Sequence, residues 1–211
     1  MPSATPSSSD LGSLIGQLQN NLAHNSHQNS PQLLTKSKLA LLHANALQPS
    51  SDTPPQLLAQ AQQILELGAL VSIRLQDPAA FTRYFQQLQG FYDIPAEKAA
   101  EVQKSYAGQR SKVTGLYLLL LLSQGDYAGF HTVLEGLETS HNERRARGVK
   151  GKGIEEDEFV QYPVRLESWL MEGSYDRVWG ETRSERVPCE EFGVFSNVST
   201  THSSHNLLED C

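Results

Sequence analysis

The sequence has little of what marks a disulfide-stabilised or membrane-spanning protein. Only two of its 211 residues are cysteines, Cys189 and Cys211, and no Cys-x-x-Cys pair is present, so two reduced thiols are expected. The longest apolar run, Leu116–Leu122, is far shorter than the ~20 residues of a membrane span. No basic stretch followed by an apolar one opens the sequence, so no signal peptide is expected.

Positive charge is also in short supply. The formal net charge is −7, which argues against a general nucleic-acid binder because phosphate binding needs a cationic face. One basic segment, Arg144–Lys152, could form a nucleic-acid patch or a nuclear-localisation signal. The acidic segment Glu155–Glu158 follows at once and would screen it, so a surface loop of mixed charge is the preferred interpretation.

Catalytic and cofactor-binding motifs are missing from the sequence. It contains no P-loop, no Gly-x-Gly-x-x-Gly, no Gly-x-Ser-x-Gly and no His-Glu-x-x-His. The glycine-rich segment Gly148–Gly153 follows no predicted strand, unlike a phosphate-binding loop. The pairs His24/His27 and His202/His205 have the spacing of metal ligands but lie in polar tails. We therefore predict no enzymatic activity and no catalytic, cofactor-binding, metal-binding or small-molecule site.

Composition divides the chain into three parts. Residues 1–30 are rich in Ser, Asn, Gln and His and predict a mobile arm that contains one short amphipathic helix. Residues 31–196 predict a helical-repeat domain, interrupted at 139–158 by a flexible charged loop. Residues 197–211 are polar and predict a disordered tail.

What the sequence does contain is helical periodicity. Signals for strands are sparse, and apolar or small residues recur at three- and four-residue steps, which places them on one face of a helix. In the stretch from residue 58 to residue 75 these are Leu58, Ala61, Leu65, Gly68, Ser72 and Leu75.

A helix-ending and helix-starting signal occurs three times. Asp77, Asp126 and Ser174 are each suited to cap a new helix, and each comes directly after a helix end. Gly125 and Gly173 precede two of them and suit the left-handed residue that ends a helix. The three caps lie about 48 residues apart, as expected for a degenerate repeat of helical hairpins. The predicted fold class is therefore all-α, with stacked helical hairpins that resemble an α-solenoid.

Four blocks of sequence resemble the PCI family, the helical subunits of the proteasome lid, the signalosome and the initiation factor. They are most similar to the small non-ATPase subunit type of the 26S proteasome lid. The block with the pattern P-V-x-L-E-x-x-L-M-E-G-S-Y is the most distinctive. The blocks are Lys36–Leu42, Ile64–Tyr92, Gly115–Leu137 and Tyr162–Trp179.

This resemblance implies a non-catalytic scaffold that acts through its surfaces. Its partners would be other lid subunits, with no nucleic acid, membrane or small-molecule substrate, and it would work in the cytoplasm and nucleus in ubiquitin-dependent degradation. The last hairpin supplies four candidate partner contacts, each of which could instead be hairpin core: Leu166, Trp169, Tyr175 and Trp179.

Three alternatives remain open. A sister PCI subunit, of the signalosome or of translation initiation factor three, is the nearest of them. An enzyme such as a peptidase or deubiquitinase would need a catalytic constellation that the motifs do not supply. A nucleic-acid binder would use Arg144–Lys152.

The end of the sequence departs from the family. PCI subunits continue into a winged-helix module, whereas residues 197–211 have neither its apolar period nor its length. We therefore expect a C-terminally truncated form in which the winged-helix module is missing.

Overall fold

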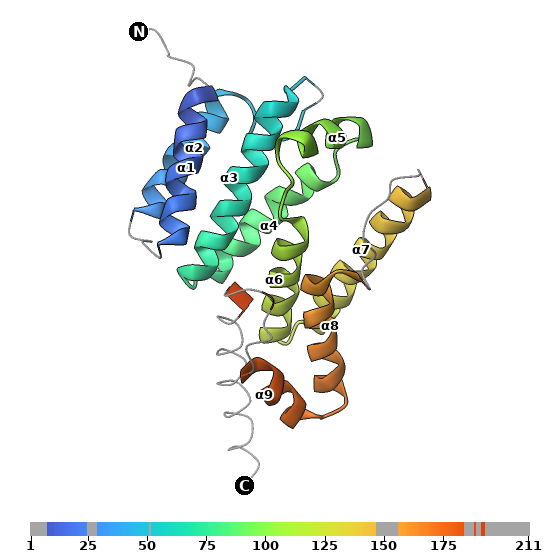
Figure 1. Ribbon diagram of the computed structural model, residues 1–211. Helices are drawn as coiled ribbons and strands as arrows, with labels where there is room; N and C mark the ends of the chain where they lie inside the picture. The colour runs from blue at the N-terminus through green and yellow to red at the C-terminus, as the bar shows by residue number, and fades with distance from the viewer. Residues whose placement is uncertain are drawn as a thin grey trace. The chain divides into compact units, whose positions relative to one another are not determined.

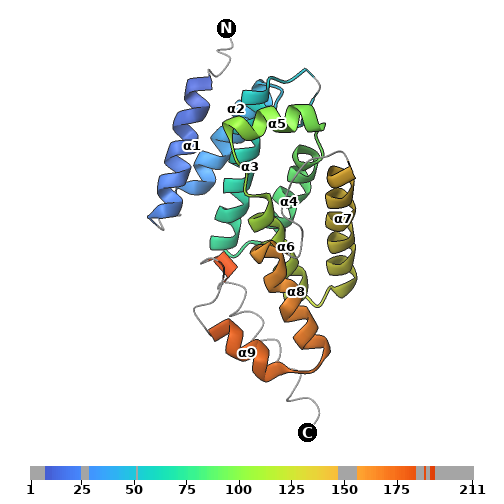
Figure 2. The same cartoon turned by 45° about the vertical axis from the view of Figure 1, so that its right-hand side comes forward.

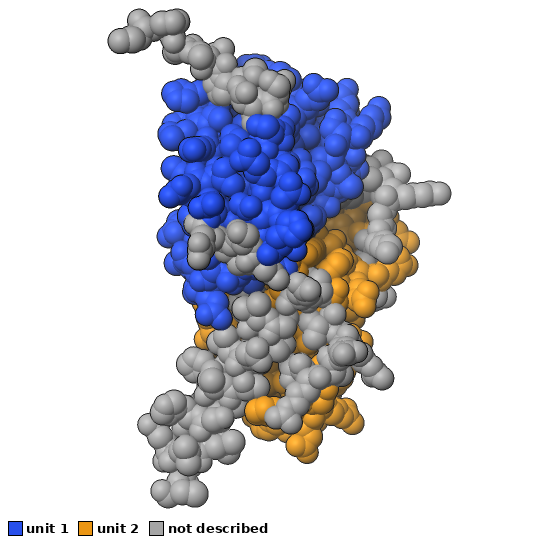
Figure 3. All heavy atoms as spheres, turned by 60° about the vertical axis from the view of Figure 1, so that its left-hand side comes forward, with its two compact units in different colours: residues 1–110 blue, residues 111–211 orange. Residues whose placement is uncertain are grey.

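A computed structural model describes residues 8–24, 29–50, 52–146, 156–183, 188 and 191–192. These described residues form nine helices and no strand, which confirms the all-α prediction (Figure 1). The chain forms two compact units, Met1–Arg110 (unit 1) and Ser111–Cys211 (unit 2), which Figure 3 colours separately.

Unit 1 is built around one long helix, α3. This helix packs against the four other helices of the unit. Every residue from Ile64 to Ile73 is buried, because this stretch is apolar on nearly all sides and not only along the predicted single face. The helices of the unit are α1 (Ser8–Ala23), α2 (Ser30–His43), α3 (Pro55–Arg74), α4 (Pro78–Tyr92) and α5 (Ala96–Ser105).

Helix α1 belongs to the packed body of unit 1, which corrects the prediction of a mobile arm for this stretch. Its stripe of Leu11, Ile15 and Leu18 is only 1%, 6% and 0% exposed. These i, i+4, i+7 positions share one helical face, and that face packs on α2 and α3. The short amphipathic helix predicted there is confirmed, whereas residues 1–7 and 25–28 lie outside the described part of the chain.

A glycine allows α3 and α4 to approach closely. A Cβ atom on Gly68 would lie 2.5 Å from Cε1 of Tyr84, closer than any real side chain allows. Glycine inside a helix costs about 1 kcal/mol relative to alanine. That cost is smaller than the strain of displacing a buried aromatic ring, so packing decides the residue at this position.

A buried carboxylate ties α3 to the segments that follow it. Glu66 is 1% exposed and accepts four hydrogen bonds. The side chain of Gln62 and the hydroxyl of Tyr92 donate to Oε1 at 3.0 and 3.1 Å. The hydroxyl of Tyr106 and the backbone N–H of Gln109 donate to Oε2 at 2.6 and 2.7 Å. These bonds compensate the desolvation of the carboxylate and fix the path of residues 106–109.

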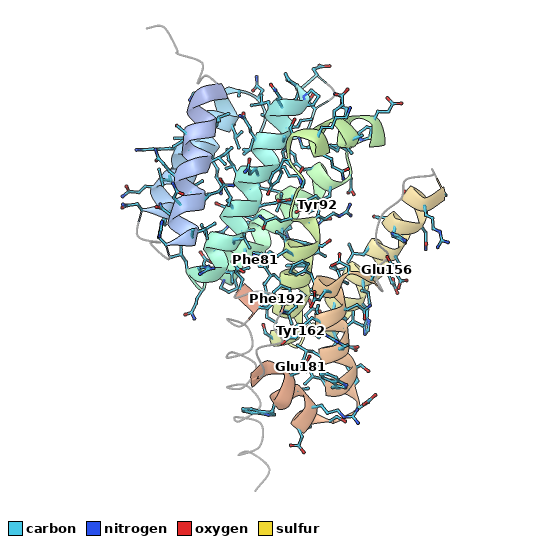
Figure 4. All side chains as sticks on the ribbon, viewed as in Figure 1. Phe81, Tyr92, Glu156, Tyr162, Glu181 and Phe192 are labelled. Carbon is cyan, nitrogen blue, oxygen red and sulfur yellow. The ribbon has the colours of Figure 1, made fainter. Side chains whose placement is uncertain are left out.

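The two phenols of this network hold their protons tightly. Burial and then the Glu66 carboxylate raise the pKa of both Tyr92 and Tyr106 well above the ordinary value. Both hydroxyls therefore remain donors to the carboxylate at neutral pH. Figure 4 labels Tyr92, which projects from α4 inside unit 1.

Unit 2 contains the rest of the described helices. Its core joins α6, α7 and α8 through the buried side chains of Leu118, Leu121, Phe130 and Val160. The helices are α6 (Arg110–Ser123, whose first residue is the last of unit 1), α7 (Tyr127–Ala146), α8 (Glu158–Met171) and α9 (Tyr175–Arg183).

The predicted charged loop at 139–158 is partly helical. Helix α7 continues to Ala146, because polar residues such as Glu143 and Arg145 are good helix formers and no breaker occurs before Gly148. Residues 147–155 lie outside the described part, as do residues 197–211 of the predicted tail.

The same backbone turn ends four helices. The residue after each C-cap is left-handed, with φ of 50°, 56°, 72° and 71° at Asn45, Gln76, Gly125 and Gly173. In every case the next N–H donates to the carbonyl five residues earlier at 2.9 Å, which defines a Schellman motif. The three turns predicted from the repeated caps are therefore confirmed, and the turn at Asn45 is a fourth.

Capping residues start the next helix directly after three of these turns, whereas α3 begins only at Pro55, well beyond the turn at Asn45. Oδ1 of Asp77 accepts from the N–H of Ala80, and Oδ1 of Asp126 accepts from the N–H of Gly129, both at 2.9 Å. Ser174 holds the same place before α9, where its backbone carbonyl accepts from the N–H of Arg177 at 3.1 Å. At these three turns only three residues, the C-cap, the left-handed residue and the N-cap, lie between one helix and the next. The chain therefore folds back on itself.

Replacing Gly173 by valine tests the turn between α8 and α9. A β-branched residue at φ +71° should destabilise this hairpin by about 1 kcal/mol or more. Thermal unfolding followed by circular dichroism measures the change. Gly136→Val is the matched control, since Gly136 lies within α7 with open space at its Cβ position. Equal melting curves for wild type and Gly173→Val would contradict the left-handed turn.

Removing one phenol tests the Glu66 network. Tyr106→Phe should lower the free energy of unfolding of unit 1 by about 2 kcal/mol, because a hydrogen bond to a charged group is lost. Hydrogen exchange of the α3 amides reports the loss locally. Tyr127→Phe, at a partly exposed position of α7, should leave these amides unchanged. Unaltered exchange in Tyr106→Phe would show that the bond contributes nothing.

Candidate protein-interaction surface

The most distinctive block of the sequence forms the hairpin of α8 and α9. Oδ1 of Asp157 accepts from the N–H of Phe159 at 3.1 Å and starts α8. The left-handed Gly173 ends it, and α9 begins at Tyr175. Figure 2 shows the two helices meeting at this short turn.

Ion pairs join the two helices of this hairpin. Nη2 of Arg165 lies 4.0 Å from Oε1 of Glu181, and Nη1 of Arg177 lies 3.9 Å from Oε2 of Glu172. Both pairs are long, and the arginine of each is at least half exposed, so each pair contributes little to stability. Their effect is to leave the outer surface of the hairpin mixed in charge.

The four predicted contact residues do not share one environment. Leu166 is 7% exposed and belongs to the core, so it cannot meet a partner without unfolding. Trp169 and Trp179 are half-buried. Tyr175 is 55% exposed and alone among the four presents most of its side chain. The hairpin therefore offers a partner one full aromatic side chain and parts of two indole rings.

Sequence reasoning missed Met171, which is 57% exposed. Met171 ends α8 and Tyr175 begins α9, so the two side chains flank the turn at Gly173. We call the segment Met171–Tyr175 the hairpin tip. A flexible thioether beside an aromatic ring is typical of adaptable protein-binding surfaces. The signal was the block L-M-E-G-S-Y itself, in which an apolar residue directly precedes the end of the helix.

A proline and a glycine shape the contact between α8 and α6. Pro163 lies inside α8 and has no N–H, so the carbonyl of Phe159 lacks its usual helical donor. That carbonyl faces Gly115 of α6 so closely that a Cβ atom at residue 115 would overlap it. Only glycine fits, and the close approach fixes how α8 lies on α6.

The segment after α9 returns to this contact. Phe192 is fully buried, with its ring 5.9 Å from that of Phe159 and 5.7 Å from that of Tyr162. Nζ of Lys112 lies 3.0 Å from Oε2 of the neighbouring Glu191. Figure 4 labels Phe192 and Tyr162 next to each other in unit 2. These contacts anchor the chain beyond α9 to the core of the unit.

The structure describes only part of the residues on which the alternative functions depend. Of the predicted basic patch, residues 144–146 lie in α7 and residues 147–152 are outside the described part, as are His27, His202 and His205. Among the described residues no group of three or more His, Cys, Asp or Glu side chains is arranged to hold a metal ion. No described helix is long and apolar enough to cross a membrane.

The fold and this surface define a class of protein, the all-α proteins built of helical hairpins in which the same turn joins the two helices. Residues 109–190, which include α6 to α9, match the CSN8/PSMD8/EIF3K family. The family match thus covers the helices that form the candidate surface.

Comparison with individual proteins identifies particular relatives. The chain is 33% identical to the 26S proteasome regulatory subunit RPN12 of Saccharomyces cerevisiae, over 79% of its own length. It is 35% identical to rpn12 of Schizosaccharomyces pombe, over 78% of its length. It is 30% identical to the 26S proteasome non-ATPase regulatory subunit 8 homolog A of Arabidopsis thaliana, over 74%.

The chain is a homologue of these 26S proteasome regulatory subunits, which confirms the resemblance seen in its sequence. It spans a little over half the length of these relatives, namely 57%, 53% and 53% in the same order.

Truncating Phe192 tests the anchor. Phe192→Ala should destabilise unit 2 by about 3 kcal/mol or more, because a fully buried ring is replaced by a cavity. Chemical denaturation measures the change. Tyr175→Ala is the control, and this mostly exposed residue should cost less than about 0.5 kcal/mol. Similar small effects for both variants would show that residues 191–192 are not part of the core.

Proposed function

We propose that the chain is a non-catalytic scaffold subunit of the lid of the 26S proteasome regulatory particle. It assembles with other lid subunits and supports ubiquitin-dependent protein degradation in the cytoplasm and nucleus. The observation that carries this proposal is the homology to proteasome regulatory subunits over more than three quarters of the chain in the two yeasts.

The hairpin tip supports the same proposal in physical terms. Met171 and Tyr175 expose more than half of their side chains on a short turn that is fixed by backbone hydrogen bonds. A rigid turn that presents apolar groups loses little entropy when a partner binds. Such preformed contacts suit a protein that assembles into a complex.

A second candidate is a PCI-type subunit of the signalosome or of translation initiation factor three. The description of the matched family includes the names of signalosome and initiation-factor subunits beside that of the proteasome subunit, which is the reason to test it. The relatives with the identities given above all bear proteasome names, and this favours the lid.

Co-purification separates these candidates. An affinity-tagged chain expressed in cells should recover lid subunits together with the proteasome ATPases, identified by mass spectrometry. Recovery of signalosome subunits, or of initiation factors without proteasome ATPases, would contradict the proposal. Hydrolysis of a ubiquitin–fluorophore substrate by the purified chain, lost on mutating a histidine or cysteine, would contradict its non-catalytic role.

The hairpin tip should control this recovery. The double variant Met171→Ser/Tyr175→Ser should reduce the yield of lid subunits several-fold, because the exposed apolar contact is lost while the turn stays intact. Tyr127→Ser, at another exposed aromatic residue of unit 2, is the matched control and should recover them normally. Undiminished recovery with the double variant would place the contact elsewhere on the chain.

A further inference from the structure

Helix α2 in unit 1 buries two serines and exposes two leucines. Ser30 and Ser37 are both 0% exposed, and the hydroxyl of Ser37 donates to the carbonyl of Leu33 at 2.8 Å. Leu39 and Leu42 are 51% and 54% exposed. A single exposed leucine needs no explanation. Two buried serines together with two neighbouring exposed leucines on one helix do need one.

The two leucines form one surface. They lie three residues apart, so they are neighbours on the helix, and their face lies opposite the buried face that contains Leu34 and Leu41. Helical geometry puts Lys38 on one side of this leucine pair and Lys36 on the other. The outer face of α2 is thus an apolar strip between two cations.

Helix α4 adds to the positive charge. Nζ of Lys38 lies 3.9 Å from the centre of the Tyr84 ring, and the neighbouring Arg83 is exposed. Burial and the positive charge of Arg83 lower the pKa of Lys38, which shows that two cations share this edge. The same burial raises the pKa of Tyr84 to about 12, so the ring stays neutral beneath the ammonium group.

Among the described residues these cations take part in no ion pair. Neither α2 nor α4 contains Asp or Glu, and the ion pairs of the described residues do not involve Lys36, Lys38 or Arg83. The one carboxylate of α3, Glu66, is buried in its own network. In a chain of net charge −7 this face is therefore locally cationic, and its three cations form no ion pair within the described part of the chain.

We propose that this outer face of α2 is a docking surface for an acidic amphipathic helix of a partner protein. The leucine pair would receive the apolar side chains of that helix, and Lys36, Lys38 and Arg83 would meet carboxylates along its edges. Lys38 is held over the ring of Tyr84, so part of the charged rim is ordered before the partner arrives. The surface lies in unit 1 and is independent of the hairpin tip and of the lid assignment.

A designed peptide tests this proposal on the purified chain. The probe is a fluorescein-labelled helix of about 15 residues with leucines along one face and glutamates along the other, and fluorescence anisotropy reports its binding. The acidic peptide should bind, and its affinity should fall as salt is raised. The same peptide with lysines in place of the glutamates should not bind.

Variants locate the binding to α2. Leu39→Ser/Leu42→Ser should weaken the peptide at least about tenfold, and Lys36→Glu should weaken it and reduce its salt dependence. Lys36→Glu also keeps the test valid should the leucine variant fail to fold. The matched controls in unit 1 are Leu75→Ser, at a 44% exposed leucine, and Lys104→Glu, at an exposed lysine of α5.

Three results would overturn the proposal. The first is no binding of the acidic peptide, and the second is equal binding to the wild type and the α2 variants. The third is binding of phosphatidylserine vesicles, lost in the same variants, without binding of the peptide, which would identify the partner as an anionic membrane surface.

Discussion

The architecture depends on one backbone constraint, the left-handed residue that follows a helix. Each Schellman turn satisfies the last carbonyls of one helix, and at Gln76, Gly125 and Gly173 a single N-cap residue separates the turn from the next helix. Glycine takes this conformation at little cost, whereas Gln76 must bear about 1 to 2 kcal/mol of strain. The turns at Gln76, Gly125 and Gly173 join consecutive helices directly, so short helical hairpins occur in both units.

The turns were also what the sequence predicted best. Asp126 after Gly125 and Ser174 after Gly173 are local signals, because capping and φ preference are properties of one or two residues. The turn at Gln76 was found only through its cap, Asp77, and the turn at Asn45 was not found. Asn and Gln carry a weaker preference for the left-handed region than glycine does, so their sequence signal is weaker too.

Features that depend on distant contacts could not be predicted from the sequence. The hydrogen bond between Tyr106 and Glu66 joins residues 40 positions apart, and no local sequence pattern predicts it. Helix α1 was read as part of a mobile arm because its polar composition hid the stripe of Leu11, Ile15 and Leu18 that α2 and α3 cover. In the hairpin, Leu166 is buried whereas Tyr175 is exposed, although the sequence presents both as apolar positions of one block.

The two candidate surfaces use different physics. The hairpin tip presents Met171 and Tyr175 on a rigid turn. The ion pairs between α8 and α9 contribute little. The outer face of α2 combines Leu39 and Leu42 with cations on two helices, α2 and α4, that contain neither Asp nor Glu. One surface suits close apolar packing, whereas the other suits a partner that is selected by charge.

Hydrogen exchange of the chain tests the central claim, that helical hairpins hold a surface for neighbouring subunits. The exchange of the backbone amides is measured in the isolated chain and again after the chain is added to a purified proteasome lid that lacks this subunit. The account predicts that the chain binds and that exchange slows in residues 158–183, most strongly around the turn at Gly173. Absence of binding, or binding that leaves these amides unchanged, would contradict it.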